Sequence, residues 1–234
     1  MIYIGIDDTD TLDTPGTNQL ARALVASVAA DYRPLLILRH QLLFDPRVPY
    51  TSKNGSASIL LEPRGGASAA GLITRLRLGM QAWFKAGSDP GLCVTEDVPP
   101  ALTAFAARCK GELVRQQEAR DLAAGHGVHL EGIGGTQDGV IGALAAVGLA
   151  AGGDDGRVVH LGEWADDLSG AQDLATIRAR DIEVRQVGND AVVIAGRVDV
   201  GKYLRPNRRG GRVILFVRPK PGETSVDWEA VRLP

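Results

Sequence analysis

Short apolar runs rich in β-branched residues alternate with amphipathic stretches along the first 150 residues. The opening run, Ile2 to Ile6, is typical of a buried strand, and the segment from Gly16 to Ala30 repeats its apolar residues at helical spacing. Further predicted strands cover 34–38, 56–61 and 92–94, and further predicted helices cover 67–85, 101–110, 114–124 and 140–149. Because alternating strands and helices cover each other's apolar faces, the sequence predicts an α/β (α+β) fold with a mixed sheet.

The pattern changes at a polar, glycine-rich run from Ala151 to Gly156, which is the best candidate for an internal connector. Beyond it strands dominate, with predictions at 158–161, 183–187, 191–195 and 213–217 and a hairpin turn at Asn189 and Asp190. The sequence therefore predicts a larger α/β domain over residues 1–152 and a smaller β-rich module over residues 153–234.

Composition narrows the class of protein. The 234 residues are 44% hydrophobic and carry a net charge of -2, which is ordinary for a globular chain and disfavours a dedicated nucleic-acid binder. No apolar run reaches about 18 residues, and the start lacks a basic leader, so we expect a cytoplasmic protein without a membrane partner. Cys93 and Cys109 are too few for a disulfide framework and are expected to be small buried side chains.

Three carboxylates follow the first predicted strand, at Asp7, Asp8 and Asp10. Such a cluster is costly without a compensating cation, and carboxylate oxygens suit Mg²⁺ that also carries substrate phosphates. In open α/β sheets ligands collect at the carboxyl ends of strands, and the next helix directs N–H groups at an anion there. The pattern predicts a Mg²⁺ and ATP site with Thr9, Gly16 and Thr17 near the nucleotide. The alternative is an Asp/Thr-rich turn that only caps the helix.

Two other segments are weaker candidates for phosphate binding. Lys53 and Asn54 lie in a long polar loop, where a lysine charge and an amide could meet a nucleotide; the alternative is an ordinary surface loop. Gly134 and Gly135 lie in a glycine-rich run before the helix at 140–149, where backbone N–H groups could surround a phosphate. That run lacks the lysine of a P-loop, and close helix packing explains the glycines equally well.

A basic segment near the end of the chain could bind phosphates, although a solvated hairpin loop is the simpler interpretation. Its arginines are Arg205, Arg208, Arg209 and Arg212. The four histidines show no metal-ligand spacing, and no serine lies in a nucleophile motif.

Several motifs together resemble the archaeal tRNA-isoleucine agmatinylcytidine synthetase family. In order along residues 1 to about 165 they are Gly5 to Asp10, Val48-Pro49-Tyr50, Asn54-Gly55, Asp89-Pro90-Gly91 and Gly139 to Leu144. The first is the most specific, because its aspartates match the family's metal-binding positions. The resemblance implies a kinase-like domain with Mg²⁺ and ATP at Asp7, Asp8 and Asp10, and places Lys53 and Asn54 in a basic, polar loop of that site. It leaves a ferredoxin-like arrangement as one option for the β-rich module.

The sequence also departs from that family. Where the family has Gly-Met-Cys-Thr-Thr with a phosphorylated threonine, this chain has Gly-Thr-Asn-Gln-Leu, with Gln19 nearest that threonine and Thr17 close by. A chain of this length with two cysteines is expected to lack the family's OB-fold and zinc ribbon.

Three hypotheses follow. The leading one is an ATP-dependent transferase or ligase that moves a phosphoryl or nucleotidyl group to an unidentified small-molecule or RNA acceptor. The second is tRNA wobble-cytidine modification with a partner supplying the RNA-binding parts. The third is a non-catalytic module that senses nucleotide or metal. No motif supports or excludes a homo-oligomer.

Overall fold

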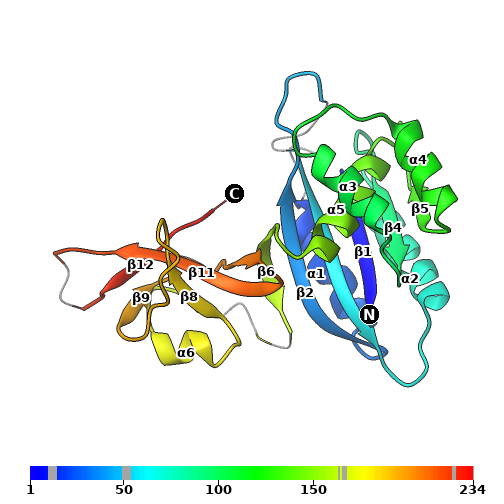
Figure 1. Cartoon of the computed structure of the whole chain (residues 1–234). Helices are drawn as coiled ribbons and strands as arrows, with labels where there is room; N and C mark the ends of the chain where they lie inside the picture. Colours follow the sequence, from blue (N-terminus) through cyan, green and yellow to red (C-terminus); the bar gives the residue numbers. More distant parts are fainter. Residues whose placement is uncertain (10–14, 49–53, 163, 165–167, 223–224, 234) are drawn as a thin grey trace.

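The computed structural model describes residues 1–9, 15–48, 54–162, 164, 168–222 and 225–233 (Figure 1). Its first half alternates strands and helices, as the sequence predicts. In chain order the elements are β1 (Ile2–Asp7), α1 (Thr17–Val28), β2 (Tyr32–Gln41), β3 (Gly55–Pro63), α2 (Ala69–Trp83), β4 (Gly91–Thr95), α3 (Pro100–Arg108), α4 (Gln116–Gly125), β5 (His129–Gly132) and α5 (Gly139–Gly152). None of the described helices is long and apolar enough to cross a membrane.

The strands of the first half lie in the order β5-β4-β1-β3-β2, and every neighbouring pair is antiparallel. β1 is therefore central, between β3 and β4. Ile6 of β1 is opposite Ala57 of β3, and Asp7 is opposite Gly91 of β4. The carboxyl end of β1 consequently shares one edge of the sheet with the amino ends of β3 and β4.

Helices cover both faces of this half of the sheet. Ile2, Ile4 and Ile6 of β1 are fully buried in a core with α1 and α2, because alternate residues of a strand share a face. On the other face α5 contacts β1, and α3 and α4 contact α5. Figure 1 shows α3 and α4 outside α5.

Helix α5 approaches β1 so closely that glycine is required at the contact. A Cβ atom on Gly5 would lie 1.9 Å from the carbonyl oxygen of Ala143, and one on Gly148 would lie 2.3 Å from that of Leu102 in α3. Because no real Cβ tolerates such distances, these glycines allow a nearly all-buried helix to pack backbone to backbone. The close packing of α5 therefore depends on Gly5 of β1 and on Gly148 of α5.

The second half continues the same sheet. Its elements are β6 (Arg157–Leu161), β7 (Ala171–Asp173), α6 (Leu174–Arg178), β8 (Glu183–Gln186), β9 (Arg197–Asp199), β10 (Asn207–Arg209), β11 (Arg212–Pro219) and β12 (Trp228–Ala230). β6 pairs with β2, and the order continues β10-β11-β12-β9-β7, with β8 on β11. The pairs β8–β11 and β9–β12 are parallel, so the described sheet is mixed. Figure 1 shows these strands extending to one side of the helix-covered half.

The predicted fold class is confirmed: the chain is a mixed α/β structure with a helix-rich first half and a β-rich second half. The predicted boundary at 152/153 coincides with the end of α5. One apolar core combines residues from both sides of it, among them Leu38 of β2 and Val158 of β6. Independent folding of the two predicted domains stays a prediction.

Some elements differ from the predictions. Residues 191–195 are not a strand, because after one bridge between Arg185 and Val192 the segment leaves β8. The tight turn before it is present, with Asp190 at a φ of 57°. β5, β7, β9, β10 and β12 were not predicted, since strands of three or four residues are too short to show an alternating pattern.

Candidate functional site

The candidate site lies at the sheet edge where β1 ends. The neighbours of β1 run antiparallel to it, so the rule for parallel sheets that led us to expect a ligand here does not apply. The same edge nevertheless gathers the predicted segments. Asp7 lies beside the amino ends of β3 and β4, and Gly91 of β4 is opposite Gly132, the last residue of β5.

Asp7 is nearly buried, with 9% of its surface exposed. Its carboxylate lies against the first turns of α5, because a Cβ on Gly142 would be 1.6 Å from Asp7 Oδ2. Glycine at 142 therefore makes room for this carboxylate. The positive end of the α5 dipole stabilises a negative charge placed there.

Asp8 leaves the strand in the left-handed backbone region, with a φ of 48°. Aspartate is one of the few residues other than glycine that adopts this conformation readily. The carbonyl oxygen of Asp8 accepts a hydrogen bond from the amide of Asp89 at 3.1 Å. The turn after β1 is thus fixed by the loop that precedes β4, and the Asp8 side chain is partly exposed at the edge.

Asp89 also fixes the glycine-rich run. Its carboxylate accepts hydrogen bonds from the amide of Thr136, at 2.6 Å, and from the Thr136 hydroxyl. Gly135 has a φ of 61°, and a Cβ there would lie 1.5 Å from Asp89 Oδ1. At Gly134 a Cβ would be 2.4 Å from the ring of Phe84. Both glycines are thus needed for close approach, and Asp89 places their loop next to Asp8.

The first amides of α5 are already bonded to backbone carbonyls. The amides of Gly139, Val140 and Ile141 donate to the carbonyl oxygens of Asp89, Gln137 and Asp138 respectively. A phosphate would have to displace these bonds to use the amides. The role of Gly134 and Gly135 in nucleotide binding stays a prediction, and the start of α5 is a poor place for the anion.

The start of α1 differs. Gly16 is its N-cap, and no side chain of the described residues caps it. The hydroxyl of Thr9 donates a hydrogen bond to Oγ1 of Thr17 at 3.1 Å, and both residues are buried. This bond joins the segment after β1 to the first turn of α1. An uncapped helix start with a fixed hydroxyl is well suited to an anion.

Of the remaining predicted site residues, Asp10 and Lys53 lie outside the described residues. Asn54 lies directly before β3, at the same edge as Asp7. Its side-chain amide donates to the carbonyl oxygen of Leu43 at 2.8 Å, so it holds the ends of the intervening loop together. A contact between Asn54 and a nucleotide stays a prediction.

The donor set fits Mg²⁺ in the form that carries a nucleotide. The described residues contain no group of three His, Cys, Asp or Glu side chains that could hold a metal by itself. Mg²⁺ usually takes only one or two carboxylates and completes its shell with waters and phosphates. Asp7 and Asp8 offer two hard carboxylates of this kind: Asp7 lies against the first turns of α5, and the segment after Asp8 is bonded to the first turn of α1 through Thr9.

The cysteines are buried and unpaired, as predicted. Burial, with smaller contributions from the negative charges of Glu118 and Asp7, raises the pKa of the Cys109 thiol to about 12. Burial also raises the pKa of Cys93. Neither thiol is a nucleophile at neutral pH, because the reactive form is the thiolate.

The sequence reasoning missed two arrangements. Asp89 was quoted only as part of a turn, and no local pattern links it to Thr136, 47 residues away. The second is a buried chain of polar groups: His40 Nδ1 lies 2.8 Å from Asp155 Oδ1, and His40 Nε2 lies 2.9 Å from Ser58 Oγ. His40 and Ser58 are fully buried and bonded to each other, so this hydroxyl already has its partner. These three hydrogen-bonded side chains join β2 and β3 to the connector after α5.

Comparisons with known proteins support the fold. No family model matches the sequence, and no curated protein matches it. Among solved structures, the chain is similar to a tRNA fluorescent labeling enzyme (24% identity, TM-score 0.55, 63% of this chain and 35% of that chain). It is also similar to apo TiaS, a tRNAIle2 agmatidine synthetase (23%, 0.53, 63% and 35%), and to the TiaS–tRNA(Ile2)–ATP complex (23%, 0.52, 63% and 36%). The chain thus spans about a third of these structures and shares their fold over about two thirds of its own length. The family resemblance seen in the sequence is confirmed at the level of the fold.

Proposed function

We propose that this chain is a Mg²⁺-dependent, ATP-using enzyme that modifies an RNA, with the nucleotide at the edge formed by Asp7, Asp8 and the start of α1. The observation that carries the proposal is that Asp7 and Asp8 end β1 at the sheet edge where Thr9 is bonded to the first turn of α1, a helix start that no described side chain caps. A fold shared with an enzyme solved with tRNA and ATP supports the nucleotide and the acceptor class.

Each residue has a distinct part in this proposal. Asp7 and Asp8 would hold the metal, and Asp10 would join them from the segment that follows. A bound Mg²⁺ neutralises phosphate charge and orients the group to be transferred. The α1 amides and the Thr17 hydroxyl would donate hydrogen bonds to phosphate oxygens. The hydrogen bond from Thr9 keeps the Thr17 hydroxyl in place.

The proposed acceptor follows from the shared fold. The chain covers about a third of the TiaS structures. Binding of a whole tRNA would therefore need further residues or a partner chain. A small-molecule acceptor stays the alternative. Transfer from α-labelled or γ-labelled ATP to a tRNA pool separates nucleotidyl from phosphoryl transfer. ATP that stays intact, with no labelled RNA, AMP, ADP, pyrophosphate or small-molecule product, would favour a nucleotide-sensing module.

Isothermal titration of Mg·ATP tests the site. Asp8→Asn keeps a residue that tolerates the left-handed backbone and removes the charge. We expect it to weaken Mg·ATP binding at least about tenfold, since a metal ligand charge is lost. The matched control is Asp97→Asn, an exposed aspartate after β4 at the opposite edge, with unchanged affinity. Wild-type protein that binds no Mg·ATP, or equal affinity in both variants and wild type, would overturn the proposal.

A further inference from the structure

Three strands of the sheet place a row of polar residues on one face. Arg39 of β2 is directly opposite Arg157 of β6, and Arg157 is directly opposite Asn207 of β10. Residues directly opposite each other in antiparallel strands point to the same face, and like charges in this position are destabilising. We call Arg39, Arg157 and Asn207 the cross-sheet row.

The row lies in a concentration of positive charge. Burial lowers the pKa of Arg157. The nearby positive charges of Arg39, Arg232 and Arg205 lower it further. Among the described residues neither Arg157 nor Arg232 makes an ion pair, and Arg157 Nε is buried without a hydrogen-bond partner. Like charges brought together and partly removed from water need a compensating anion.

Asn207 is the second, independent observation. It is fully buried, with 0% of its surface exposed, and neither its amide nitrogen nor its amide oxygen has a hydrogen-bond partner in the part of the chain that is described. A buried amide left in this state costs free energy, and buried polar groups are almost always satisfied. An oxyanion next to Arg157 would accept from the amide nitrogen.

Helix α1 contacts β6 next to the cross-sheet row. Arg22 donates a hydrogen bond to the carbonyl oxygen of Val159 on β6. Asn18 lies one turn nearer the start of α1, about 6 Å, and Arg157 lies two residues nearer the start of β6, about 7 Å. Because both elements run in the same direction from the site edge, Asn18 lies at the level of Arg157. Oδ1 of Asn18 is also buried without a partner among the described residues.

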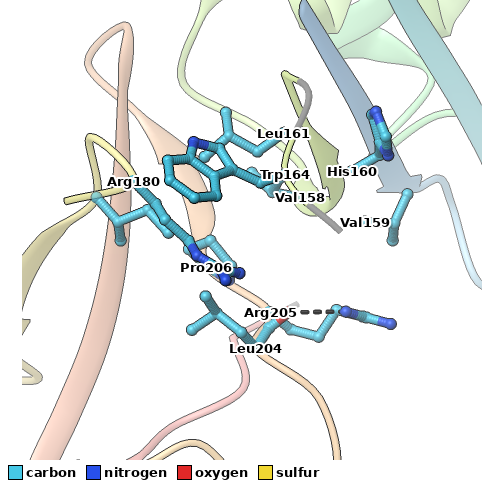
Figure 2. Close-up of a pocket in the computed structure, with 10 residues that line it drawn as sticks. Val158, Val159, His160, Leu161, Trp164, Arg180, Leu204, Arg205 and Pro206 are labelled. Atoms are coloured by element: carbon cyan, nitrogen blue, oxygen red, sulfur yellow. Dashed lines mark hydrogen bonds between the residues drawn. The ribbon is translucent and has the colours of Figure 1, made fainter. Parts of the chain in front are cut away.

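A neighbouring pocket is distinct from the cross-sheet row. It lies between β6 and the segment before β10, and Figure 2 shows Arg180 beside Trp164 there, with Arg205 extending away from both. Its volume of about 40 Å³ leaves room for little more than a water molecule. Arg205 lines this pocket, its guanidinium lies over the ring of Tyr203, and its positive charge also acts on Arg157.

We propose that the cross-sheet row, with Arg205, Arg232 and the facing side of α1, binds a phosphate group. The ligand is an anion that carries a phosphate, either a free phosphorylated small molecule or a single backbone phosphate of an RNA. The site is separate from the Mg²⁺ carboxylates, because Arg39 is two strands from Ile6 of β1, about 10 Å, and faces the side opposite Asp7. The proposal does not rest on ATP binding.

Thermal unfolding with inorganic phosphate, without Mg²⁺ and at constant ionic strength, tests it. At ten times the Kd we expect the wild-type Tm to rise by roughly 3–6 °C. Arg157→Gln should lose most of this rise. Its Tm without phosphate should equal or exceed that of the wild type, because like-charge repulsion is relieved. A merely structural arginine would give the opposite sign. Arg232→Gln, an exposed position near the chain end, should reduce the rise without affecting folding.

The matched control is Arg33→Gln, since Arg33 is an arginine on the same strand β2 that pairs with Glu62 and is exposed. It should keep the full rise, which also accounts for any general stabilisation of proteins by phosphate salts. Asp8→Asn should keep it as well. If Asp8→Asn lost Mg·ATP binding and kept the phosphate rise, both proposals would stand. Wild-type protein that shows the phosphate rise but binds no Mg·ATP would overturn only the proposed function, and wild-type protein that binds Mg·ATP but shows no rise would overturn only this proposal.

An eight-nucleotide RNA at equal phosphate concentration separates the two sources. A rise with inorganic phosphate alone supports a free phosphorylated molecule. A rise with both ligands, lost in Arg157→Gln in both cases, supports an RNA phosphate in the same site. A rise with RNA alone that Arg157→Gln abolishes also supports an RNA phosphate. A rise that Arg157→Gln reduces no more than Arg33→Gln does would overturn the proposal, as would no rise with either ligand.

Discussion

The two halves of the described sheet are stabilised in different ways. In the first half, helices cover both faces of β1 to β5, and glycines let α5 lie directly on the strands. In the second half, β7, β9, β10 and β12 have three residues each, and the only described helix, α6, has five. Many of its side-chain contacts are surface ion pairs, such as Arg218 with Glu229.

This difference indicates which part of the backbone is most tightly fixed by its neighbours. The candidate Mg²⁺ edge is built on the helix-covered half, where a displacement of one backbone disturbs several elements. The second half buries its own apolar core against β2 and β3, while exposed ion pairs and exposed apolar side chains such as Ile194 lie on its outer surface. Substitutions in the first half, at the boundary between the two halves and in the second half should therefore change the free energy of unfolding by very different amounts.

The largest effect is expected at Gly5. Gly5→Ala places a Cβ 1.9 Å from the carbonyl oxygen of Ala143, so α5 must move away from β1. We expect the free energy of unfolding to fall by about 3 kcal/mol or more, measured by urea denaturation. The control is Gly111→Ala, where a Cβ meets no atom within 4 Å and a small gain is expected from the restricted unfolded chain. Equal effects at both positions would show that close packing of α5 does not stabilise the first half.

A moderate, pH-dependent effect on the free energy of unfolding is expected at His40, at the boundary between the two halves. Burial lowers the pKa of His40 below its usual 6.5, against the opposing effect of Asp155; the positive charges of Lys110 and Arg39 lower it further. The unfolded chain therefore takes up a proton at a higher pH than the folded protein. The contribution of neutral His40 to the free energy of unfolding is fully present above pH 6.5 and declines as the pH falls below that value. The total loss is about 1.4 kcal/mol for each unit by which the folded-state pKa lies below the unfolded-state pKa.

His40→Gln should remove that decline between pH 6.5 and 5, and should cost about 1–3 kcal/mol at pH 8 through the lost bonds to Asp155 and Ser58. Asp155 contributes separately at lower pH, because its pKa is below the usual 3.8 despite burial, owing to His40 and Lys110. Chemical denaturation of both proteins across this range measures the difference. An unchanged slope in His40→Gln would assign the pH dependence to other groups.

The smallest effect is expected in the second half, at Arg218. Its ion pair with Glu229 joins β11 and β12 on an exposed surface. Because exposed pairs lose in side-chain entropy most of what they gain, Arg218→Gln should change the free energy of unfolding by less than about 0.5 kcal/mol. A loss near that of Gly5→Ala would remove the distinction between the halves. High salt should affect the wild type and the variant alike.

Much of the first half could be predicted from sequence because its elements are long and periodic. The opening strand, α1, α2 and α5 were predicted within a few residues, since buried faces impose their periods on the sequence. The predicted strand at 34–38 extends over Tyr32–Gln41 in the structure, with an irregularity between Pro34 and Leu36. The short strands of the second half give no such signal, and their pairing depends on distant partners.

The candidate site was predictable in part. Asp7, Asp8, Thr9 and Thr17 could be singled out because they follow one strand and start one helix. Their environment could not: the antiparallel neighbours, the closeness of Asp7 to Gly142, and the role of Asp89 all join segments far apart in the chain. Nothing local marked Asn207 or Arg157 either.

The sequence by itself determined the helix-rich first half, the carboxylates that follow its first strand, and the glycines that permit close packing. It did so because local periodicity and residue chemistry are properties of neighbouring positions. Only the tertiary structure decided that Asp89 holds the glycine-rich run beside Asp8, and that Arg39, Arg157 and Asn207 share one face. Strand register and burial depend on which distant segments pair, and no local pattern carries that information.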